Sequence, residues 1–160
     1  MKYDVETLEA DLLALMKSKI AAKLSEITTE KGDSITLDVP LDSQYFNTTD
    51  DEVNNETLSV QYGVIDGEPF SISSATSEDN RYIFLLYLNE MNELPGIVRK
   101  KLFRYIRAFK EIIEENFDAF PCVSKLNIKT IAPTSAGWDE NETSPVYKVG
   151  GIYIESAMAS

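Results

Sequence analysis

The residue types in this chain leave few routes to nucleophilic or metal-dependent chemistry. The sequence contains one cysteine, Cys122, and no histidine. A Ser-His-Asp or Cys-His catalytic site therefore cannot be built, and neither can a zinc site with histidine or several cysteine ligands. Cys122 follows Pro121 and has no candidate base nearby in the sequence, so we expect an inert core thiol. We predict a protein that is not an enzyme, with no catalytic residues, no cofactor and no metal site.

Asp50, Asp51 and Glu52 are the remaining candidates for binding a divalent cation. The stretch lacks the glycine and the spaced oxygen ligands of an EF-hand loop, so a solvated acidic loop is favoured. A metal-dependent enzyme that uses acidic side chains alone stays an alternative, although no convergent spacing supports it.

Positive charge gathers on one segment of an otherwise acidic chain. Six of the fifteen Lys and Arg residues fall within "RKKLFRYIRAFK", residues 99–110. On a helical wheel Lys100, Arg104 and Arg107 lie within about 60° of each other, and Arg99 and Lys110 flank them. These five residues form a basic stripe that we expect on the solvent side of a helix. The simplest interpretation is a solvated helix face.

The helix dipole makes a second interpretation worth weighing. Arg99, Lys100 and Lys101 lie near the N-terminal end of the predicted helix, while Glu114 and Glu115 lie near its C-terminal end. This is the reverse of the order that the dipole favours, and each exposed misplaced charge costs on the order of 0.3–1 kcal/mol. We therefore expect an acidic surface of another molecule, and most simply of a second copy, to hold the stripe. This interpretation requires that the cations are not paired within their own chain.

Trp138 is the other candidate for contact with a partner. It is followed by Asp139 and Glu140 in a polar segment, and an exposed tryptophan is a good interface anchor. We interpret residues 138–140 as a partner-docking loop, with Trp138 folded back onto its own sheet as the open alternative. Tyr82, Phe84 and Tyr87 resemble a stacking platform for bases, but in so apolar a stretch they are core residues more often.

The elements that must position these residues follow from hydrophobic periodicity. Apolar residues at three- and four-residue steps predict two long amphipathic helices, and alternating or continuous apolar runs predict strands. We expect an α+β fold, in which a mainly antiparallel sheet of about five to six strands packs against the two helices. Long exposed loops are expected at about 41–56 and 132–145. The predicted helices cover 4–27 and 95–117, and the predicted strands cover 34–39, 57–65, 69–73, 81–88, 125–131 and 146–155.

Length and composition suit one domain, residues 1–160. The chain is 43% hydrophobic and carries a formal net charge of −12, so most of its surface repels nucleic acid and anionic membranes. There is no run of apolar residues long enough to cross a membrane and no pattern of a secretion signal. The single cysteine favours a reducing, intracellular origin.

The order of elements resembles the tail terminator, or tail completion, proteins of long-tailed bacteriophages. The resemblance rests on an N-terminal amphipathic helix, on "YIFLLYL" followed by the helix "PGIVRKKLFRYIRAFKEII", and on the closing strands "KLNIKTI" and "VYKVGGIYIE". It implies a structural protein of the virion tail or neck, assembled in the host cytoplasm. Such a protein forms a homo-hexameric ring that caps the tail tube, ends its polymerisation and joins the tail to the head-side connector. DNA passes through the lumen of the ring without specific binding. No catalytic residue is implied.

Under this resemblance the basic stripe keys neighbouring subunits, with Arg99, Lys100, Arg104, Arg107 and Lys110 as the subunit interface. The runner-up is an acidic inhibitor or immunity-type protein, possibly a DNA mimic, that covers a basic partner with its acidic loops. That alternative predicts a monomer or dimer rather than a ring.

Overall fold

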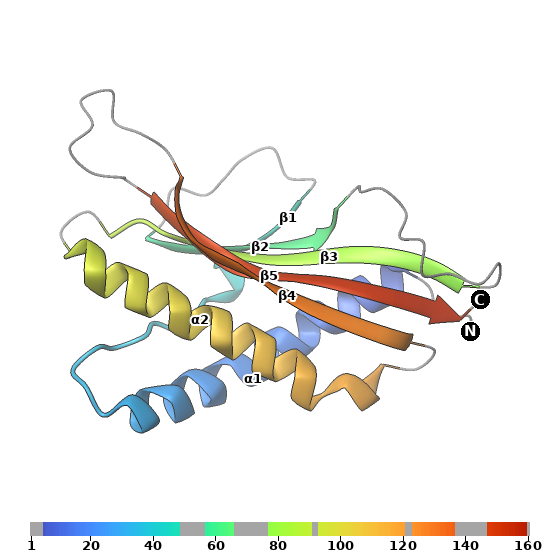
Figure 1. The fold of residues 1–160 in the computed structure, drawn as a ribbon, viewed down its shortest axis with the longest axis horizontal. Coiled ribbons are helices and arrows are strands. Elements are labelled where there is room, and N and C mark those ends of the chain that lie inside the picture. The colour runs from blue at the N-terminus through green and yellow to red at the C-terminus, as the bar shows by residue number, and fades with distance from the viewer. Residues whose placement is uncertain are drawn as a thin grey trace.

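The computed structural model describes residues 5–48, 57–65, 77–90, 93–120, 123–136 and 147–159. Two long helices lie on one face of a twisted five-stranded sheet (Figure 1). The helices are α1 (Val5–Lys31) and α2 (Pro95–Glu115). Two short 3-10 helices also occur: η1 (Asp42–Gln44) comes after α1, and η2 (Phe117–Ala119) comes after α2. The expected α+β class with two long helices is confirmed.

The sheet has the strand order β1-β2-β3-β5-β4, so β1 and β4 are its two edges. Only β1 and β2 are parallel, and every other neighbouring pair is antiparallel. The mainly antiparallel character is confirmed, with five strands among the described residues. The strands are β1 (Tyr45–Asn47), β2 (Leu58–Val64), β3 (Ser77–Leu88), β4 (Val123–Ala136) and β5 (Tyr147–Ala159).

The hydrophobic core lies between the sheet and the two helices. On β3 the helix-facing residues Tyr82, Phe84, Leu86 and Leu88 are at most 2% exposed. Tyr82 and Phe84 are therefore core residues, as expected. Tyr87 belongs to the other face of the sheet, where its ring lies 6.0 Å from that of Phe46 and its hydroxyl donates to Gln61. The helix residues that meet this core repeat at helical spacing: Leu8, Leu12, Met16, Ile20, Leu24 and Ile27 on α1, and Val98, Leu102, Tyr105, Phe109, Ile112 and Ile113 on α2.

Two glycines let α2 and β3 approach β5 closely. A Cβ at Gly150 would lie 2.9 Å from Ile106 Cδ1 of α2, and a Cβ at Gly151 would overlap the Phe84 carbonyl oxygen of β3. A groove lies between α2 and the edge strand β4.

The structure corrects several element boundaries. Residues 34–39 do not form a strand: Leu37 packs on the core, but the Tyr105 hydroxyl bonds the Asp38 carbonyl, so the segment follows α2 instead of joining the sheet. The segment 41–56 is not all loop, because it contains η1 and β1. Leu94 is the N-cap of α2, and Pro95 stands in its first turn as the predicted start at residue 95 requires. Strand β4 continues to Ala136, five residues beyond the predicted strand.

Candidate interaction surfaces

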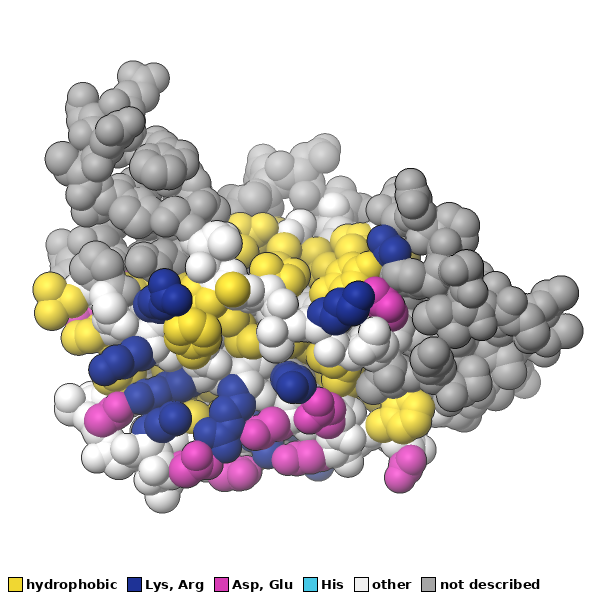
Figure 2. All heavy atoms as spheres, viewed as in Figure 1, with side chains coloured by type: hydrophobic (Ala, Val, Ile, Leu, Met, Phe, Trp, Pro, Cys, Tyr) yellow, Lys and Arg dark blue, Asp and Glu magenta, His cyan; other side chains and the backbone are white. Residues whose placement is uncertain are grey.

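Helix α2 carries the basic stripe beside the acidic end of α1. The pairs Lys23–Glu111, Glu30–Arg107 and Asp33–Arg104 run in opposite directions along the two segments, so the helices are antiparallel. The cationic first half of α2 therefore faces the last turns of α1 and the residues after it. Figure 2 shows the result on one face: Lys and Arg side chains gather over α2, and Asp and Glu side chains lie along the margin where α1 runs.

Arg104 is buried rather than exposed. Only 6% of it is accessible, and its guanidinium binds the Asp33 carboxylate with both terminal nitrogens, Nη1 to Oδ1 at 2.9 Å and Nη2 to Oδ2. Two parallel charged hydrogen bonds of this kind are strong and directional. They lower the pKa of Asp33 from 3.8 to about 2, with the hydrogen bond from Arg104 as the largest cause. The expectation that Arg104 faces solvent is wrong.

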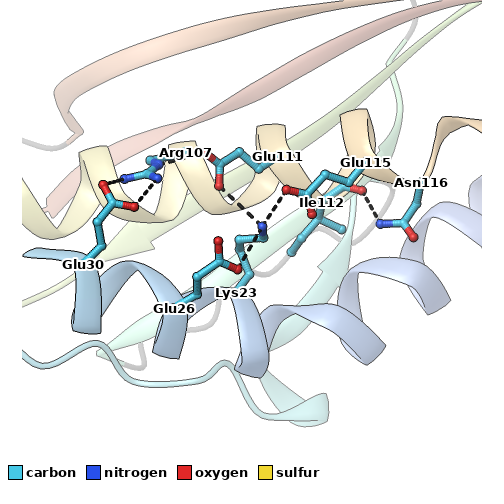
Figure 3. A network of polar contacts seen from close by, with 8 residues as sticks. All are labelled: Lys23, Glu26, Glu30, Arg107, Glu111, Ile112, Glu115 and Asn116. Carbon is cyan, nitrogen blue, oxygen red and sulfur yellow. Dashed lines mark hydrogen bonds and ion pairs between the residues drawn. The ribbon is translucent and has the colours of Figure 1, made fainter.

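Arg107 is also satisfied within its own chain (Figure 3). Its Nη1 and Nη2 atoms lie 2.9 and 2.7 Å from the two carboxylate oxygens of Glu30, and its Nε lies 2.9 Å from Glu111. These hydrogen bonds lower the pKa of Glu30 and of Glu111. The reversed charges of α2 are thus balanced by α1, and no neighbouring molecule is required to explain them. That part of the argument for an interface at Arg104 and Arg107 is wrong.

Lys23 extends the same network toward the other end of α2. Its side chain is 7% exposed and its Nζ lies 2.8 Å from Glu115, 3.2 Å from Glu26 and 3.5 Å from Glu111. Figure 3 shows the ammonium group between these three carboxylates. The hydrogen bond that Lys23 donates to Glu115 is the largest of the effects that raise the pKa of Lys23. This cluster could not be predicted from the sequence, because its members lie on two different helices.

The remaining cations of the segment differ in how tightly they are paired. Lys101 forms a close ion pair with Glu90 at 3.0 Å, whereas the pair of Lys110 with Glu114, one helical turn away, is longer at 3.7 Å. Arg99 is exposed and lies over the ring of Phe103, with its guanidinium carbon 5.2 Å from the ring centre. Of the five stripe residues, Arg99, Lys100 and Lys110 are therefore the ones whose charge remains available at the surface.

A groove lies between α2 and the edge strand β4, with a volume of about 400 Å³. Phe103 is an exposed aromatic residue of its lining, with 46% of its surface accessible. Sequence reasoning missed this surface; the available signal was an aromatic residue outside the apolar stripe of the helix. We name it the α2–β4 groove, and it is lined by Phe103, Ile106, Arg107, Lys110, Glu111, Glu114, Thr130 and Ala132.

A second exposed apolar site precedes β1 at the opposite edge of the sheet. Val39 and Leu41 are 42% and 63% exposed, and acidic side chains at Asp38 and Asp42 flank them. We name residues 38–42 the acidic knob. Only Leu94 and Phe103 join Val39 and Leu41 as exposed large hydrophobic residues in the described part of the chain.

Other residues singled out in the sequence lie outside the described residues. These are Trp138, Asp139 and Glu140 of the predicted docking loop, Asp50, Asp51 and Glu52, and Cys122. Within the described ranges, no group of three or more Cys, Asp or Glu residues is arranged to hold a metal ion. None of the described helices is both long enough and apolar enough to cross a membrane.

No protein-family model matches this chain, and no curated protein does either. The likeness to tail terminator proteins therefore rests on the order of the elements alone.

Proposed function

We propose that this chain is a non-enzymatic virion assembly protein of the tail terminator type. In this proposal it forms a homo-hexameric ring that caps the phage tail tube, ends polymerisation of the tube and joins the tail to the head-side connector. The protein acts in the tail or neck of the virion after assembly in the host cytoplasm.

The order and packing of the elements carry this proposal. A long first helix is followed by strands, then by a second long helix, and then by two long closing strands, β4 and β5, with both helices on one face of the sheet (Figure 1). Function does not follow from fold alone, so a second kind of support is needed. It comes from the position of the exposed apolar residues: two sites at opposite edges of the sheet suit a protein that contacts copies of itself.

The charge of the chain fits the same role. With 27 acidic and 15 basic residues, a ring of such subunits would present an acidic lumen. Negative potential repels the phosphate backbone, so DNA would pass through the lumen without adhering to it. The internal pairing of Arg104 and Arg107 removes two cations that would otherwise attract DNA.

Tail tube polymerisation provides the test. The purified chain is added to tail tube protein while tubes are growing, and tube length and tube ends are measured by negative-stain electron microscopy. We expect shorter tubes that end in a ring, because a bound cap removes the growing end. An unrelated acidic protein of similar size and charge is the control. Tubes of unchanged length with uncapped ends would contradict the proposal.

The acidic inhibitor remains a second candidate, and one observation favours it. Lys23, Lys101, Arg104 and Arg107 are engaged in internal ion pairs, so few cations remain free at the surface, while the net charge of −12 is unchanged. A protein of this kind would bind a basic enzyme or a nucleic-acid-binding protein as a monomer. Binding to basic proteins that weakens steeply with salt, together with a failure to cap tail tubes, would favour this candidate.

A further inference from the structure

The two exposed apolar sites of this protein differ in the charges that flank them. The α2–β4 groove is a hollow beside one edge strand of the sheet, and the acidic knob precedes the other edge strand. Because β1 and β4 are opposite edges, the knob of one copy is placed to meet the groove of another copy. A contact between two different surfaces of the same protein is heterologous, and repetition of it closes a ring when the rotation allows.

The groove offers an apolar floor with a partly cationic rim. Phe103, Ile106 and Ala132 supply the apolar surface, and Arg107 and Lys110 lie beside them together with the carboxylates of Glu111 and Glu114, with which they form ion pairs. Arg99 lies over the outer ring face of Phe103, which adds a third cation to this side of α2. A volume of about 400 Å³ is within the range of pockets that hold small ligands, and it has room for a leucine side chain.

The acidic knob has the opposite character. Leu41, which is 63% exposed, is its apolar tip, and Asp38 and Asp42 flank that tip. No Lys or Arg occurs between Gly32 and Gln44. An apolar tip between two carboxylates therefore matches Phe103 beside Arg99 and the loosely paired Lys110.

The knob is held in one conformation before any partner arrives. The Tyr105 hydroxyl donates to the Asp38 carbonyl at 2.6 Å, which fixes the start of the knob on α2. At its end the Leu41 amide donates to the Gln44 side chain at 2.7 Å, and the Gln44 amide donates to the Leu41 carbonyl at 2.9 Å. A preorganised loop loses little conformational entropy when it binds.

The ion pairs at the two sites are the loosest among the described residues. Lys17–Asp42 spans 3.8 Å and Lys110–Glu114 spans 3.7 Å, whereas the others are 3.5 Å or shorter. Asp42 is also 91% exposed. Asp42 and Lys110 can therefore exchange these weak internal partners for each other at low cost.

We propose that the acidic knob of one copy docks into the α2–β4 groove of a second copy, with Leu41 against Phe103 and Asp42 beside Lys110. This inference rests on the proposed function, since it names the subunit contact of the ring. It moves that contact from the buried Arg104 and the internally paired Arg107 to Leu41 and Phe103, which are exposed. Each copy uses its knob on one neighbour and its groove on the other.

Two charge-introducing variants test the contact from its two sides. Leu41→Glu removes the apolar tip and Phe103→Glu removes the floor, and both positions are exposed, so neither change disturbs the core. We expect wild-type protein to form species larger than a dimer at high concentration in sedimentation velocity. Each variant should raise the dissociation constant at least tenfold, the scale of losing a central interface anchor. Leu94→Glu, at an exposed apolar residue outside the groove, is the matched control and should leave the constant unchanged within about twofold.

Mixing the two variants separates a head-to-tail contact from other kinds of association. Leu41→Glu retains an intact groove and Phe103→Glu retains an intact knob, so an equimolar mixture should form dimers through one good contact and nothing larger. A mixture that stays monomeric, or a wild-type protein that stops at a symmetric dimer or remains monomeric at its highest soluble concentration, would overturn the inference.

Cross-linking captures the contact even when association is weak. In a Cys122→Ser background, Leu41→Cys combined with Ala132→Cys should give a ladder of disulfide-linked oligomers under mild oxidation. The combination of Leu41→Cys with Lys19→Cys, which lies on an exposed position of α1, should not. Failure of the ladder with intact tube capping would overturn this contact alone. Failure of capping with an intact ladder would overturn the proposed function and leave the contact standing.

Discussion

Arg104 lies on the side of α2 where a helical wheel predicts exposure, yet 94% of its surface is covered. The wheel is correct about the face of the helix. It contains no information on Asp33, which follows the other helix and reaches the guanidinium across 71 positions of sequence. At the residue scale, a charge that looks unpaired in sequence is paired in space.

The first prediction distinguishes a structural arginine from a surface arginine. Arg104→Glu places a carboxylate beside Asp33 and should lower the free energy of unfolding by about 2 kcal/mol or more, the scale of a charged hydrogen bond that is lost. Arg99→Glu changes an exposed residue of the same helix and should alter stability by less than about 0.5 kcal/mol. Urea unfolding followed by circular dichroism measures both. Equal stability of the two variants would show that the Asp33 pair contributes nothing.

The second prediction concerns the close approach of β5 to β3. Gly151→Ala should destabilise the protein by about 3 kcal/mol or more, because the added Cβ meets backbone atoms that cannot move aside. Gly96→Ala is the matched control: its Cβ meets nothing within 4 Å, and in the first turn of α2 alanine should raise stability by up to about 1 kcal/mol. Thermal melting checks the opposite signs. A tolerated Gly151→Ala would mean that β5 and β3 are further apart than described.

At the scale of elements, the antiparallel pairing of α1 and α2 explains the charge order of both helices. The last turns of α1 and the residue pair after it carry Glu26, Glu30 and Asp33, which is unfavourable for an isolated helix dipole. The helices run in opposite directions, and this places the cationic half of α2 beside Glu30 and Asp33. Each helix therefore supplies the countercharge that the other needs.

This pairing predicts acid sensitivity. The pKa of Asp33 is lowered from 3.8 to about 2, and the pKa values of Glu30 and Glu111 are lowered from 4.5. A carboxylate whose pKa is lowered by folding stabilises the folded state above the pKa of the unfolded chain. That contribution is lost as the pH falls through the interval from about 4.5 to about 2.

Comparison with a variant isolates these pairs from general charge effects. We expect the melting temperature of the wild type to fall as the pH falls through this interval. The double variant Arg104→Met and Arg107→Met should have a lower melting temperature at pH 7, and its melting temperature should fall less because the ion pairs are already absent. Melting temperatures measured from pH 7 to pH 2 provide the comparison. Parallel curves for the two proteins would count against the pairing.

At the scale of the whole molecule, a net charge of −12 opposes any contact between copies. The proposed contact works against this repulsion through apolar surface at Leu41 and Phe103. Long-range repulsion is screened by salt, and the screening length falls from about 30 Å at 0.01 M to about 10 Å at 0.1 M. Apolar contact is not weakened by this change.

The proposed Asp42–Lys110 pair is a surface pair that contributes little, so relief of the repulsion between two chains of charge −12 outweighs its screening, and self-association should strengthen as salt rises over this range. An interface made of the basic stripe and an acidic loop would show the opposite trend, because its attraction is itself ionic. Sedimentation velocity at the two salt concentrations decides between them. Association that weakens with salt would favour an ionic interface at Arg99, Lys100 and Lys110.

The sequence by itself determined the elements whose signal is periodic and local. Both long helices, the central strand at 81–88 and the two closing strands were predicted because burial imposes a repeat on the residues that face the core. Residues 34–39 show the limit of this reasoning. They alternate like a strand, but Tyr105 bonds the Asp38 carbonyl and the segment lies along α2 instead. Leu37 packs on the core but Val39 is 42% exposed, so alternation alone reports neither which of these side chains are buried nor what buries them.

Tertiary structure alone decided the partners of the charges and the places where apolar residues stay exposed. The pairing of Arg104 with Asp33, the carboxylates around Lys23 and the groove beside β4 each join residues that are distant in sequence. Such contacts depend on the relative orientation of elements, and a one-dimensional pattern does not contain it. The physical reason is that hydrophobic spacing is imposed on each element separately, whereas charge pairing and surface shape arise only between elements.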